Sequence, residues 1–218
     1  MTAALQSELP RFLSTGHPLR CGSLEASTLV TGMGMRRARR ATIAAIDRER
    51  PELLLHIGFC GAVQDGLKPG DLLLASEVVG DNQALDLRSV AIPEAREVAA
   101  GLAMHVGRLQ TRRWPTVSRR RVCPGALAVD MESFAIAQVG IERGLRTVVV
   151  KAVSDLVPKR LGPGVLRQLI GLTTGHRQAK DSLEQYVRQL LNALSADPGD
   201  VRWPSGSADN DTEAADIA

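Results

Sequence analysis

The fold class follows from two segments, Ala126-Leu-Ala-Val-Asp-Met-Glu-Ser-Phe-Ala-Ile-Ala137 and Val149-Val-Lys-Ala-Val-Ser-Asp155. Each segment opens with an apolar run that is typical of a strand, and each run is followed by carboxylates. A helical pattern lies between the two runs. Open α/β sheets place their ligand sites at the carboxyl ends of strands. The two segments therefore predict an α/β protein with a ligand site at Asp130, Glu132 and Asp155.

An earlier stretch of the chain shows the same alternation. Thr28–Thr31 is predicted as a strand, Gly32–Met35 as a tight turn, and Arg36–Arg50 as a helix with apolar or small residues on one face. Leu53–Ile57 is an uninterrupted apolar run, as in strands that are covered on both faces. A strand, a helix and a strand in this order predict parallel pairing.

The remaining elements are predicted from shorter signals. They are a loop at 58–61, a strand at 71–77, a helix at about 94–105, an arginine-rich surface excursion up to 124, a strand at 126–129, a helix at about 132–143, a strand at 147–153 and a closing helix at 183–194. Residues 1–195 are expected to form one domain. Residues 196–218 are rich in Gly, Pro, Ser and Asp, and we expect them to be an acidic, disordered tail.

The composition argues against several classes of protein. The apolar runs are too short to span a bilayer, and the amino terminus lacks the basic and apolar pattern of a signal peptide. Cys21, Cys60 and Cys123 are far apart and outside any pairing motif, so neither a disulfide framework nor a metal site is indicated. We expect a cytoplasmic protein that binds no metal.

The net charge of +3 hides an asymmetry. Residues 196–218 hold six acidic side chains and one arginine, which leaves +8 on the rest of the chain. Two arginine runs, at 36–40 and 112–121, suggest contacts with a nucleic acid. The chain has only three Phe, two Trp and one Tyr, however, so it offers little aromatic surface for stacking bases. We favour solvated arginine faces and expect no nucleic-acid partner.

Gly34 and the acidic pair Asp130 and Glu132 have structural as well as functional explanations. The Gly32-x-Gly34 turn before a helix suits an anion or a ribose hydroxyl, although a tight turn alone would explain it. Acidic residues at a helix start are stabilised by the helix dipole by about 0.3–1 kcal/mol. Asp130 also ends an apolar strand, and a buried acid requires partners. These residues are therefore candidates for binding.

Lys151 interrupts an apolar strand that is predicted to be buried. Because side chains alternate along a strand, Lys151 and Asp155 are expected on the same face. A buried ammonium requires an anion, and the candidates are Asp155, Glu8 or a substrate. Ser154 and Asp155 also have a structural explanation, as the cap of the element that follows.

Four motifs follow one another along residues 2–160. They are Gly-Met-Gly-x-x-x-Ala from Gly32, Gly-Phe-Cys-Gly-Ala from Gly58 with a downstream Pro-Gly-Asp, Val-Asp-Met-Glu-Ser from Val129, and Val-Ser-Asp from Val153. In this order they resemble the nucleoside phosphorylase and nucleosidase superfamily, in particular methylthioadenosine/adenosylhomocysteine nucleosidases and hopanoid-associated phosphorylase-like proteins. The resemblance implies one α/β domain with a mixed, largely parallel central sheet flanked by helices. It also implies cleavage of the bond between ribose and base, without a cofactor, in a homodimer or larger homo-oligomer.

The resemblance also implies a role for each site residue. Met131 would pack on the ribose, and Glu132 would accept hydrogen bonds from its hydroxyl groups. Asp155, helped by Ser154, would hold the purine and protonate it. Glu8 would activate the attacking water, as in glycoside hydrolysis, where an acid and a base act on opposite faces of the sugar. A solvated acid at a helix start is the structural alternative for Glu8.

Three departures from the family concern the attacking group. The family's first strand has several apolar residues before the position of Met1. Gly58 would allow a ligand to approach the backbone closely, but Phe59 stands where the family has a small hydroxyl residue that holds water or phosphate. Lys151 replaces an arginine, and Asp130 replaces a glutamate.

Hydrolysis of a purine nucleoside of the adenine type is therefore the predicted reaction. Phosphorolysis of the same bond is the first alternative: His56 and Phe59 stand where phosphate ligands are expected, but Arg36 and Arg37 at the glycine turn would supply a phosphate site. A non-catalytic nucleoside-binding protein is the second alternative. Selectivity for the group on the ribose 5′ carbon is expected to reside in residues 81–124.

Overall fold

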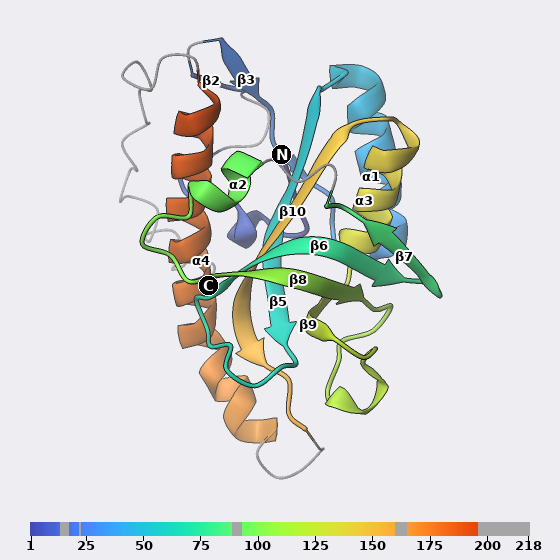
Figure 1. Ribbon diagram of the computed structural model, residues 1–218, viewed down its shortest axis with the longest axis vertical. Coiled ribbons are helices and arrows are strands. Elements are labelled where there is room, and N and C mark those ends of the chain that lie inside the picture. The colour runs from blue at the N-terminus through green and yellow to red at the C-terminus, as the bar shows by residue number, and fades with distance from the viewer. Residues whose placement is uncertain (14–17, 22, 89–92, 160–164, 196–218) are drawn as a thin grey trace, which may run out of the picture.

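The structure is a computed structural model that describes residues 1–13, 18–21, 23–88, 93–159 and 165–195 (Figure 1). Its strands are β1 (Thr2–Ala3), β2 (Leu19–Cys21), β3 (Leu24–Ala26), β4 (Leu29–Val30), β5 (Leu53–Ala62), β6 (Leu72–Gly80), β7 (Gln83–Asp86), β8 (Met104–Thr111), β9 (Ala126–Asp130) and β10 (Arg146–Leu156). Its helices are α1 (Met35–Glu49), α2 (Pro93–Glu97), α3 (Ser133–Glu142) and α4 (Val165–Leu194), with short 3₁₀ turns η1 (Gln6–Glu8) and η2 (Arg119–Arg121). No helix within these ranges has an apolar stretch long enough to cross a membrane. The predicted tail, 196–218, lies outside the described residues.

One mixed sheet forms the centre of the molecule. Its strand order is β10-β6-β8-β9-β5-β1-β4, and β7 also pairs with β6. Strand β10 pairs with β5 as well, so β5, β10, β6, β8 and β9 close into a ring. The pairs β10–β5, β6–β8 and β8–β9 are parallel, whereas β10–β6 and β5–β9 are antiparallel. The mixed, largely parallel sheet is confirmed, and its closure through β10 is an additional feature.

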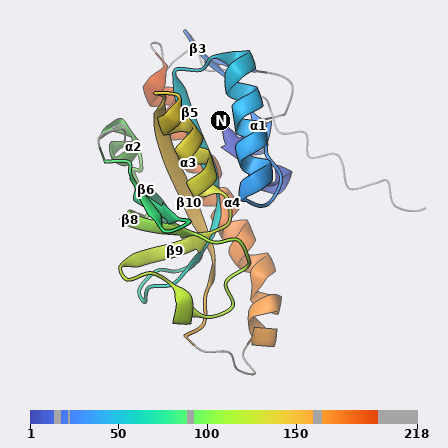
Figure 2. The same cartoon turned by 90° about the vertical axis from the view of Figure 1, so that its right-hand side faces the viewer.

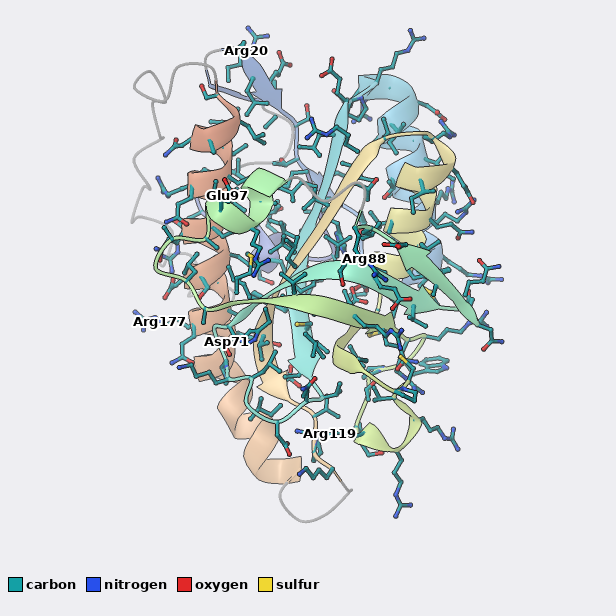
Figure 3. All side chains as sticks on the ribbon, in the orientation of Figure 1. Arg20, Asp71, Arg88, Glu97, Arg119 and Arg177 are labelled. Atoms are coloured by element: carbon teal, nitrogen blue, oxygen red, sulfur yellow. The ribbon has the colours of Figure 1, made fainter. Side chains whose placement is uncertain are left out.

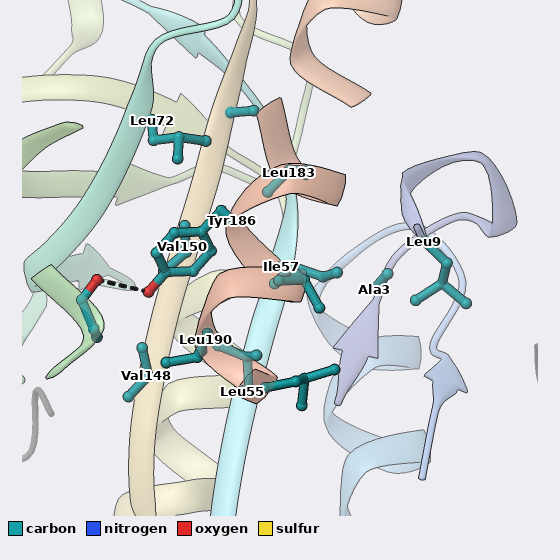
Figure 4. Close-up of a cluster of buried hydrophobic side chains, with 14 of the residues drawn as sticks. Ala3, Leu9, Leu55, Ile57, Leu72, Val148, Val150, Leu183, Tyr186 and Leu190 are labelled. Atoms are coloured by element: carbon teal, nitrogen blue, oxygen red, sulfur yellow. Dashed lines mark hydrogen bonds between the residues drawn. The ribbon is translucent and has the colours of Figure 1, made fainter. Parts of the chain in front are cut away.

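Helices cover both faces of this sheet, with α4 on one side and α1 and α3 together on the other (Figures 1 and 2). Under α4, the side chains of Tyr186 and Leu190 are buried in one cluster with Ile57 and Val150 (Figure 4). The Tyr186 hydroxyl donates a hydrogen bond of 2.9 Å to the carbonyl oxygen of Ala95 in α2. Burial of each large apolar side chain contributes about 1.5–3 kcal/mol, so this cluster fixes α4 against β5 and β10.

The helix predicted at 36–50 is confirmed as α1. It buries Ala38, Thr42 and Ile46, which are four residues apart and therefore lie on one face. Ala38 and Ile46 pack in the cluster that holds Ile136 of α3. The helix ends at Arg50, which adopts the left-handed conformation with φ of 47° before Pro51.

Two predictions of secondary structure are wrong. Residues 58–61, predicted as a loop, continue β5, because β10 pairs with this segment and β9 pairs with its end. The helix predicted at about 94–105 ends at Glu97, and Met104–Thr111 form β8 between β6 and β9. Pairing with strands that are distant in sequence thus overrides the local pattern at both places.

Candidate functional site

Most residues predicted for the site lie in, or shortly after, β1, β5, β9 and β10. Glu8 follows β1 in η1, Asp130 ends β9, and Glu132 directly precedes α3. Lys151 of β10 lies opposite Gly58 of β5. Burial is the largest single influence on the pKa of Lys151 and lowers it, but the negative charges of Asp130, Glu8 and Glu132 together outweigh burial and raise the pKa. The structure therefore brings three carboxylates together around one buried ammonium.

The Glu8 carboxylate is held by the backbone. The N–H groups of Ala4 and Leu5 each donate to Oε2 at 2.9 Å, and the N–H group of Phe59 donates to Oε1 at 3.0 Å. Only 6% of Glu8 is exposed. Three backbone donors from two separate parts of the chain fix the position of this carboxylate. The alternative of a solvated acid for Glu8 is thus wrong.

Lys151 and Asp130 form a buried ion pair. Lys151 Nζ lies 3.2 Å from Asp130 Oδ2, and each side chain is 1% exposed. Asp130 also accepts hydrogen bonds from Thr111 Oγ1 at 2.7 Å and from Ser133 Oγ at 2.5 Å. Burial opposes ionisation of Asp130, but the ammonium and these hydroxyl groups outweigh it and hold the pKa of Asp130 below its ordinary value. Both members of the pair are charged.

The partner of Lys151 differs from the three that the sequence suggested, and the cause is a bulge in β10. Pairing with β5 shifts register between Val153, opposite Cys60, and Asp155, opposite Gly61. The extra residue, Ser154, reverses the alternation of side chains, so Lys151 and Asp155 do not share a face. The expectation that they do is wrong, and Lys151 pairs with Asp130. The two departures from the family pattern at 130 and 151 therefore contact each other.

Glu132 connects the site to the glycine turn. The N–H group of Gly34 donates a hydrogen bond of 2.7 Å to Glu132 Oε1. Gly34 has φ of 92°, a conformation that glycine adopts without strain, and it is the residue before α1. Burial raises the pKa of Glu132, and Lys151 only partly offsets this effect. Met131, between Asp130 and Glu132, is half-buried.

Ser154 and Asp155 form a second part of the site. Ser154 Oγ donates a hydrogen bond of 2.7 Å to Asp155 Oδ1 and lies 3.3 Å from the carbonyl oxygen of Cys60. Asp155 is half-buried, and its Oδ2 would lie 3.2 Å from a Cβ atom at Gly61. Gly61 therefore leaves room for this carboxylate. Burial, and to a lesser extent the charges of Asp155 and Glu8, raises the pKa of the Cys60 thiol, whereas the charge of Lys151 lowers it.

Phe59 contributes its backbone to the Glu8 side of the site. Its ring stacks on His176 of α4, with a centroid distance of 5.2 Å and an interplanar angle of 17°. Two charged groups pack directly against Gly58, because a Cβ atom there would lie 2.9 Å from Lys151 Nζ and 3.1 Å from Glu8 Oε1. A glycine at this position therefore lets the ammonium and the carboxylate approach the same point of β5.

Two polar residues of the site, Thr111 and Ser133, carry no role in the sequence predictions, and His56 is named there only as standing where a phosphate ligand is expected. Thr111 and Ser133 bond Asp130, and the spacing Asp130-x-x-Ser133 is a helix-capping pattern that would have revealed the second contact. His56 is fully buried, and its Nδ1 lies 3.1 Å from Thr2 Oγ1. Burial, followed by the charge of Lys151, lowers the pKa of His56 to about 3. His56 is therefore neutral near pH 7 and provides no cation for phosphate.

A cavity of about 440 Å³ adjoins the site. It is lined by Met35, next to the glycine turn, by Thr111, and by Arg112, Arg113 and Trp114 beyond β8. The N–H group of Arg112 donates to the carbonyl oxygen of Asp130 at 2.8 Å, which connects this cavity to the carboxylates. A larger cavity of about 540 Å³ lies around the amino ends of β4 and β5 and contains none of the predicted site residues.

The chain directly after Asp155 is fixed by η2. Arg119, labelled in Figure 3, donates through Nε to the carbonyl oxygen of Val157 at 2.7 Å. Its Nη1 bonds Asp65 at 2.8 Å, and Lys159 bonds the same carboxylate at 2.6 Å. The arginine-rich excursion thus lies on the surface, as predicted, and part of it holds the end of β10 in place.

Proteins of known activity resemble the chain in sequence. The 5′-methylthioadenosine/S-adenosylhomocysteine nucleosidase of Geobacillus thermodenitrificans is 31% identical over 169 residues, which cover 66% of this chain and 70% of the relative. The 5′-methylthioadenosine nucleosidase of Arabidopsis thaliana is 28% identical over 150 residues, which cover 63% of this chain and 56% of the relative.

Solved structures resemble it in fold. The S-adenosylhomocysteine nucleosidase of Streptococcus pyogenes has a TM-score of 0.73 at 19% identity, over 88% of this chain and 95% of that one. The futalosine hydrolase of Helicobacter pylori has a TM-score of 0.72 at 18% identity, over 88% of this chain and 96% of that one. Residues 4–192 match the model of the phosphorylase superfamily. The chain therefore belongs to the phosphorylase superfamily, as its four ordered motifs predicted.

Proposed function

We propose that the protein is a nucleosidase that hydrolyses the N-glycosidic bond of an adenine-type purine nucleoside. One observation carries this proposal: the Glu8 carboxylate and the Lys151 ammonium both lie against Gly58, where a Cβ atom would be 3.1 Å and 2.9 Å from them. A water molecule there would donate a hydrogen bond to Glu8 Oε1 and accept one from Lys151 Nζ. A carboxylate that holds a water molecule is the arrangement that general-base catalysis requires.

The proposed reaction uses Glu8 and Asp155 on opposite sides of the ribose. The water oxygen attacks C1′ of the ribose while the bond between C1′ and the base nitrogen breaks, and Glu8 takes the proton of the water. The electron pair of the broken bond moves to the base, which takes a proton from Asp155. Ser154 orients Asp155 through its hydrogen bond of 2.7 Å. The products are the free base and the free ribose.

Glu132 and Met131 are proposed to hold the ribose. Gly34 fixes Oε1 of Glu132, so Oε2 would accept the hydrogen bonds of the ribose hydroxyl groups. Met131 would pack on the sugar from the turn between β9 and α3. The cavity of about 440 Å³ beyond Thr111 is proposed to receive the part that differs between nucleosides, in agreement with selectivity in residues 81–124.

Two observations favour water over phosphate as the attacking group. Glu8, Asp130 and Glu132 face a single ammonium, Lys151, and His56 is neutral, so a phosphate dianion would be repelled. Phe59 also stands where the family has the hydroxyl residue that holds phosphate, and its ring stacks on His176. Phosphorolysis remains the first alternative, with a non-catalytic nucleoside-binding protein as the second.

The choice of substrate is supported by the relatives. The curated relatives are named for 5′-methylthioadenosine and S-adenosylhomocysteine, and the solved structure of the Streptococcus pyogenes enzyme contains 5-methylthiotubericidin. We therefore propose adenine as the base that is released.

The test is to incubate the protein with 5′-methylthioadenosine, S-adenosylhomocysteine and adenosine, with and without phosphate, and to separate the products by chromatography. We expect adenine and a free sugar without phosphate, and a higher KM for Glu132→Ala. A ribose 1-phosphate product that depends on added phosphate would instead identify a phosphorylase. Binding of adenosine that Glu132→Ala abolishes, with no base released by the wild type, would identify a non-catalytic binder.

We also propose that the protein is a homodimer or a larger homo-oligomer, as the family resemblance implies. Light scattering coupled to gel filtration would measure its molar mass in solution. A mass equal to that of one chain, 23.4 kDa, would contradict this proposal.

A further inference from the structure

The surroundings of the Glu8 carboxylate have the chemistry of an oxyanion site. Three backbone N–H groups, of Ala4, Leu5 and Phe59, converge on it at 2.9–3.0 Å from two separate parts of the chain. Converging backbone N–H groups form concave sites that bind phosphate and other anions. In this chain, however, the anion that they bind is a side chain of the protein itself.

A second observation points to the same chemistry. Lys151 is fully buried, and its Nζ pairs with Asp130 Oδ2 at 3.2 Å. Its ammonium and Glu8 Oε1 also lie against the same glycine, because a Cβ atom at Gly58 would be 2.9 Å from Nζ and 3.1 Å from Oε1. An ammonium and converging N–H groups are the donors that bind inorganic phosphate in many proteins.

We propose that the three N–H groups and Lys151 form an oxyanion cradle, and that Glu8, by occupying it, determines that the enzyme uses water and excludes inorganic phosphate. This inference rests on the proposed nucleosidase function and adds a determinant of its nucleophile. Removal of the carboxylate leaves three N–H donors without their partner, one of them buried and two partly buried, which is costly unless another oxyanion binds them. Inorganic phosphate supplies oxygens of the required charge and size.

Phosphate in the emptied cradle would lie on the side of the ribose from which water attacks. One phosphate oxygen would then attack C1′ as the bond from C1′ to the base nitrogen breaks. The electron pair of that bond moves to the base, which takes a proton from Asp155, and the sugar leaves as a 1-phosphate. Asp130 remains paired with Lys151, and Glu132 remains as a nearby negative charge. The Kd for phosphate is therefore expected in the millimolar range, which corresponds to a binding free energy of about −4 kcal/mol.

The experiment compares Glu8→Ala, which empties the cradle, with Glu8→Gln, which fills it with a neutral side chain of the same size. Both variants are expected to lose hydrolysis by at least about 100-fold, because each lacks the base. At about ten times its Kd, phosphate is expected to raise the Tm of Glu8→Ala by about 3–6 °C, and the Tm of the wild type and Glu8→Gln not at all. Phosphate is also expected to increase base release by Glu8→Ala by at least about 10-fold, with a sugar 1-phosphate as product.

Formate and a second cationic variant test the location of the anion. Formate should compete with phosphate for Glu8→Ala, because it restores a carboxylate to the cradle. Adding Lys151→Met to Glu8→Ala should abolish the phosphate-dependent rise in Tm. If Glu8→Ala does not fold, Glu8→Ser, which also leaves most of the cradle open, is measured in the same way.

The proposal is overturned if phosphate stabilises neither Glu8→Ala nor Glu8→Ser. It is also overturned if phosphate stabilises Glu8→Gln as much as Glu8→Ala. The thermal measurement needs no substrate, so the cradle is tested even if the wild type releases no base. Failure of the proposed function would appear as an inactive wild type with a phosphate-binding Glu8→Ala. Failure of this inference would appear as an active wild type with a Glu8→Ala that ignores phosphate.

Discussion

The contact between Lys151 and Asp130 is the main electrostatic feature of the site at the level of single residues. Both side chains are 1% exposed, and their charged atoms are 3.2 Å apart. A buried charge that loses its partner is far more costly than an exposed one, because water cannot replace the partner. Each member of the pair therefore requires the other, which explains why both positions depart from the family pattern together.

A double-mutant cycle tests this dependence. Lys151→Met leaves Asp130 charged and buried, and should lower the free energy of unfolding by about 3–5 kcal/mol. Asp130→Asn should have a similar effect, and the double variant should cost clearly less than the two single costs together. Urea unfolding at pH 7 measures all four proteins. Additive costs would show that the two side chains do not stabilise each other.

His56 makes the stability of the protein depend on pH. Burial, and then the charge of Lys151, lowers its pKa from 6.5 to about 3, so the folded protein keeps it neutral. In the unfolded chain it takes up a proton below about pH 6.5. Stability from the neutral ring is therefore complete above pH 6.5 and is lost as the pH falls toward 3.

The matched measurement uses His56→Leu, which cannot titrate. Between pH 6.5 and pH 4, the free energy of unfolding of the wild type should fall relative to this variant by up to about 1.4 kcal/mol per pH unit. Urea unfolding at several pH values provides the comparison. Parallel curves for the two proteins would mean that His56 takes up its proton without unfolding.

The sequence places Glu8, Glu132 and Lys151 in one site, and the structure brings them together because the order of the motifs identifies which strand ends meet. The sequence assigns the wrong partner to Lys151, because side chains alternate between the two faces of a strand only where there is no bulge. No local signal in the sequence marks the bulge at Ser154. The contacts of Thr111 with Asp130 depend on β8 and β9 being neighbours, which is likewise a property of the folded sheet.

At the level of elements, the contact between α4 and β10 positions the base end of the site. Gly175 of α4 lies so close to β10 that a Cβ atom there would be 2.0 Å from the carbonyl oxygen of Ser154. Ser154 in turn bonds Asp155. A displacement of α4 would therefore move the proposed acid.

Gly175→Ala should accordingly reduce both stability and activity. Gly140→Ala is the control, because its Cβ atom would be 2.1 Å from Thr147 Oγ1, at the opposite end of β10. Both substitutions should lower the free energy of unfolding by about 1–3 kcal/mol. Only Gly175→Ala should also lower kcat/KM, by up to about 100-fold, when both variants are assayed well below their Tm. Equal loss of activity in the two would indicate a general effect of crowding.

Predicting elements from the sequence succeeds where the pattern is strong and local. The helix α1 and the strands β6, β9 and β10 follow from periodicity and from apolar runs, and all four are present. The strand β8 could not be predicted, because Met104–Thr111 alternate only weakly and gain their partners from β6 and β9. The closure of the ring through β10 has no local signal either.

At the level of the whole molecule, three of the nine arginines in the two runs form ion pairs within the fold. Arg39 lies 2.8 Å from Glu142, Arg113 lies 3.6 Å from Asp81, and Arg119 lies 2.8 Å from Asp65. These pairs join elements that are far apart in sequence. They also lower the positive potential that the linear sequence suggests, so the runs are less suited to phosphate backbones than their composition implies.

Oligonucleotides should therefore not bind to the protein, even at low salt. The full chain and a chain that ends at Ser195, which carries +8 instead of +3, are compared by fluorescence anisotropy with short single-stranded and duplex DNA. The shorter chain controls for competition by the acidic residues 196–218, which would mask a basic surface. Saturable binding by either chain that weakens steeply with salt would show that phosphate contacts form, since displaced counterions produce that dependence. If neither chain binds, the arginines stabilise the fold and line the edge of the site.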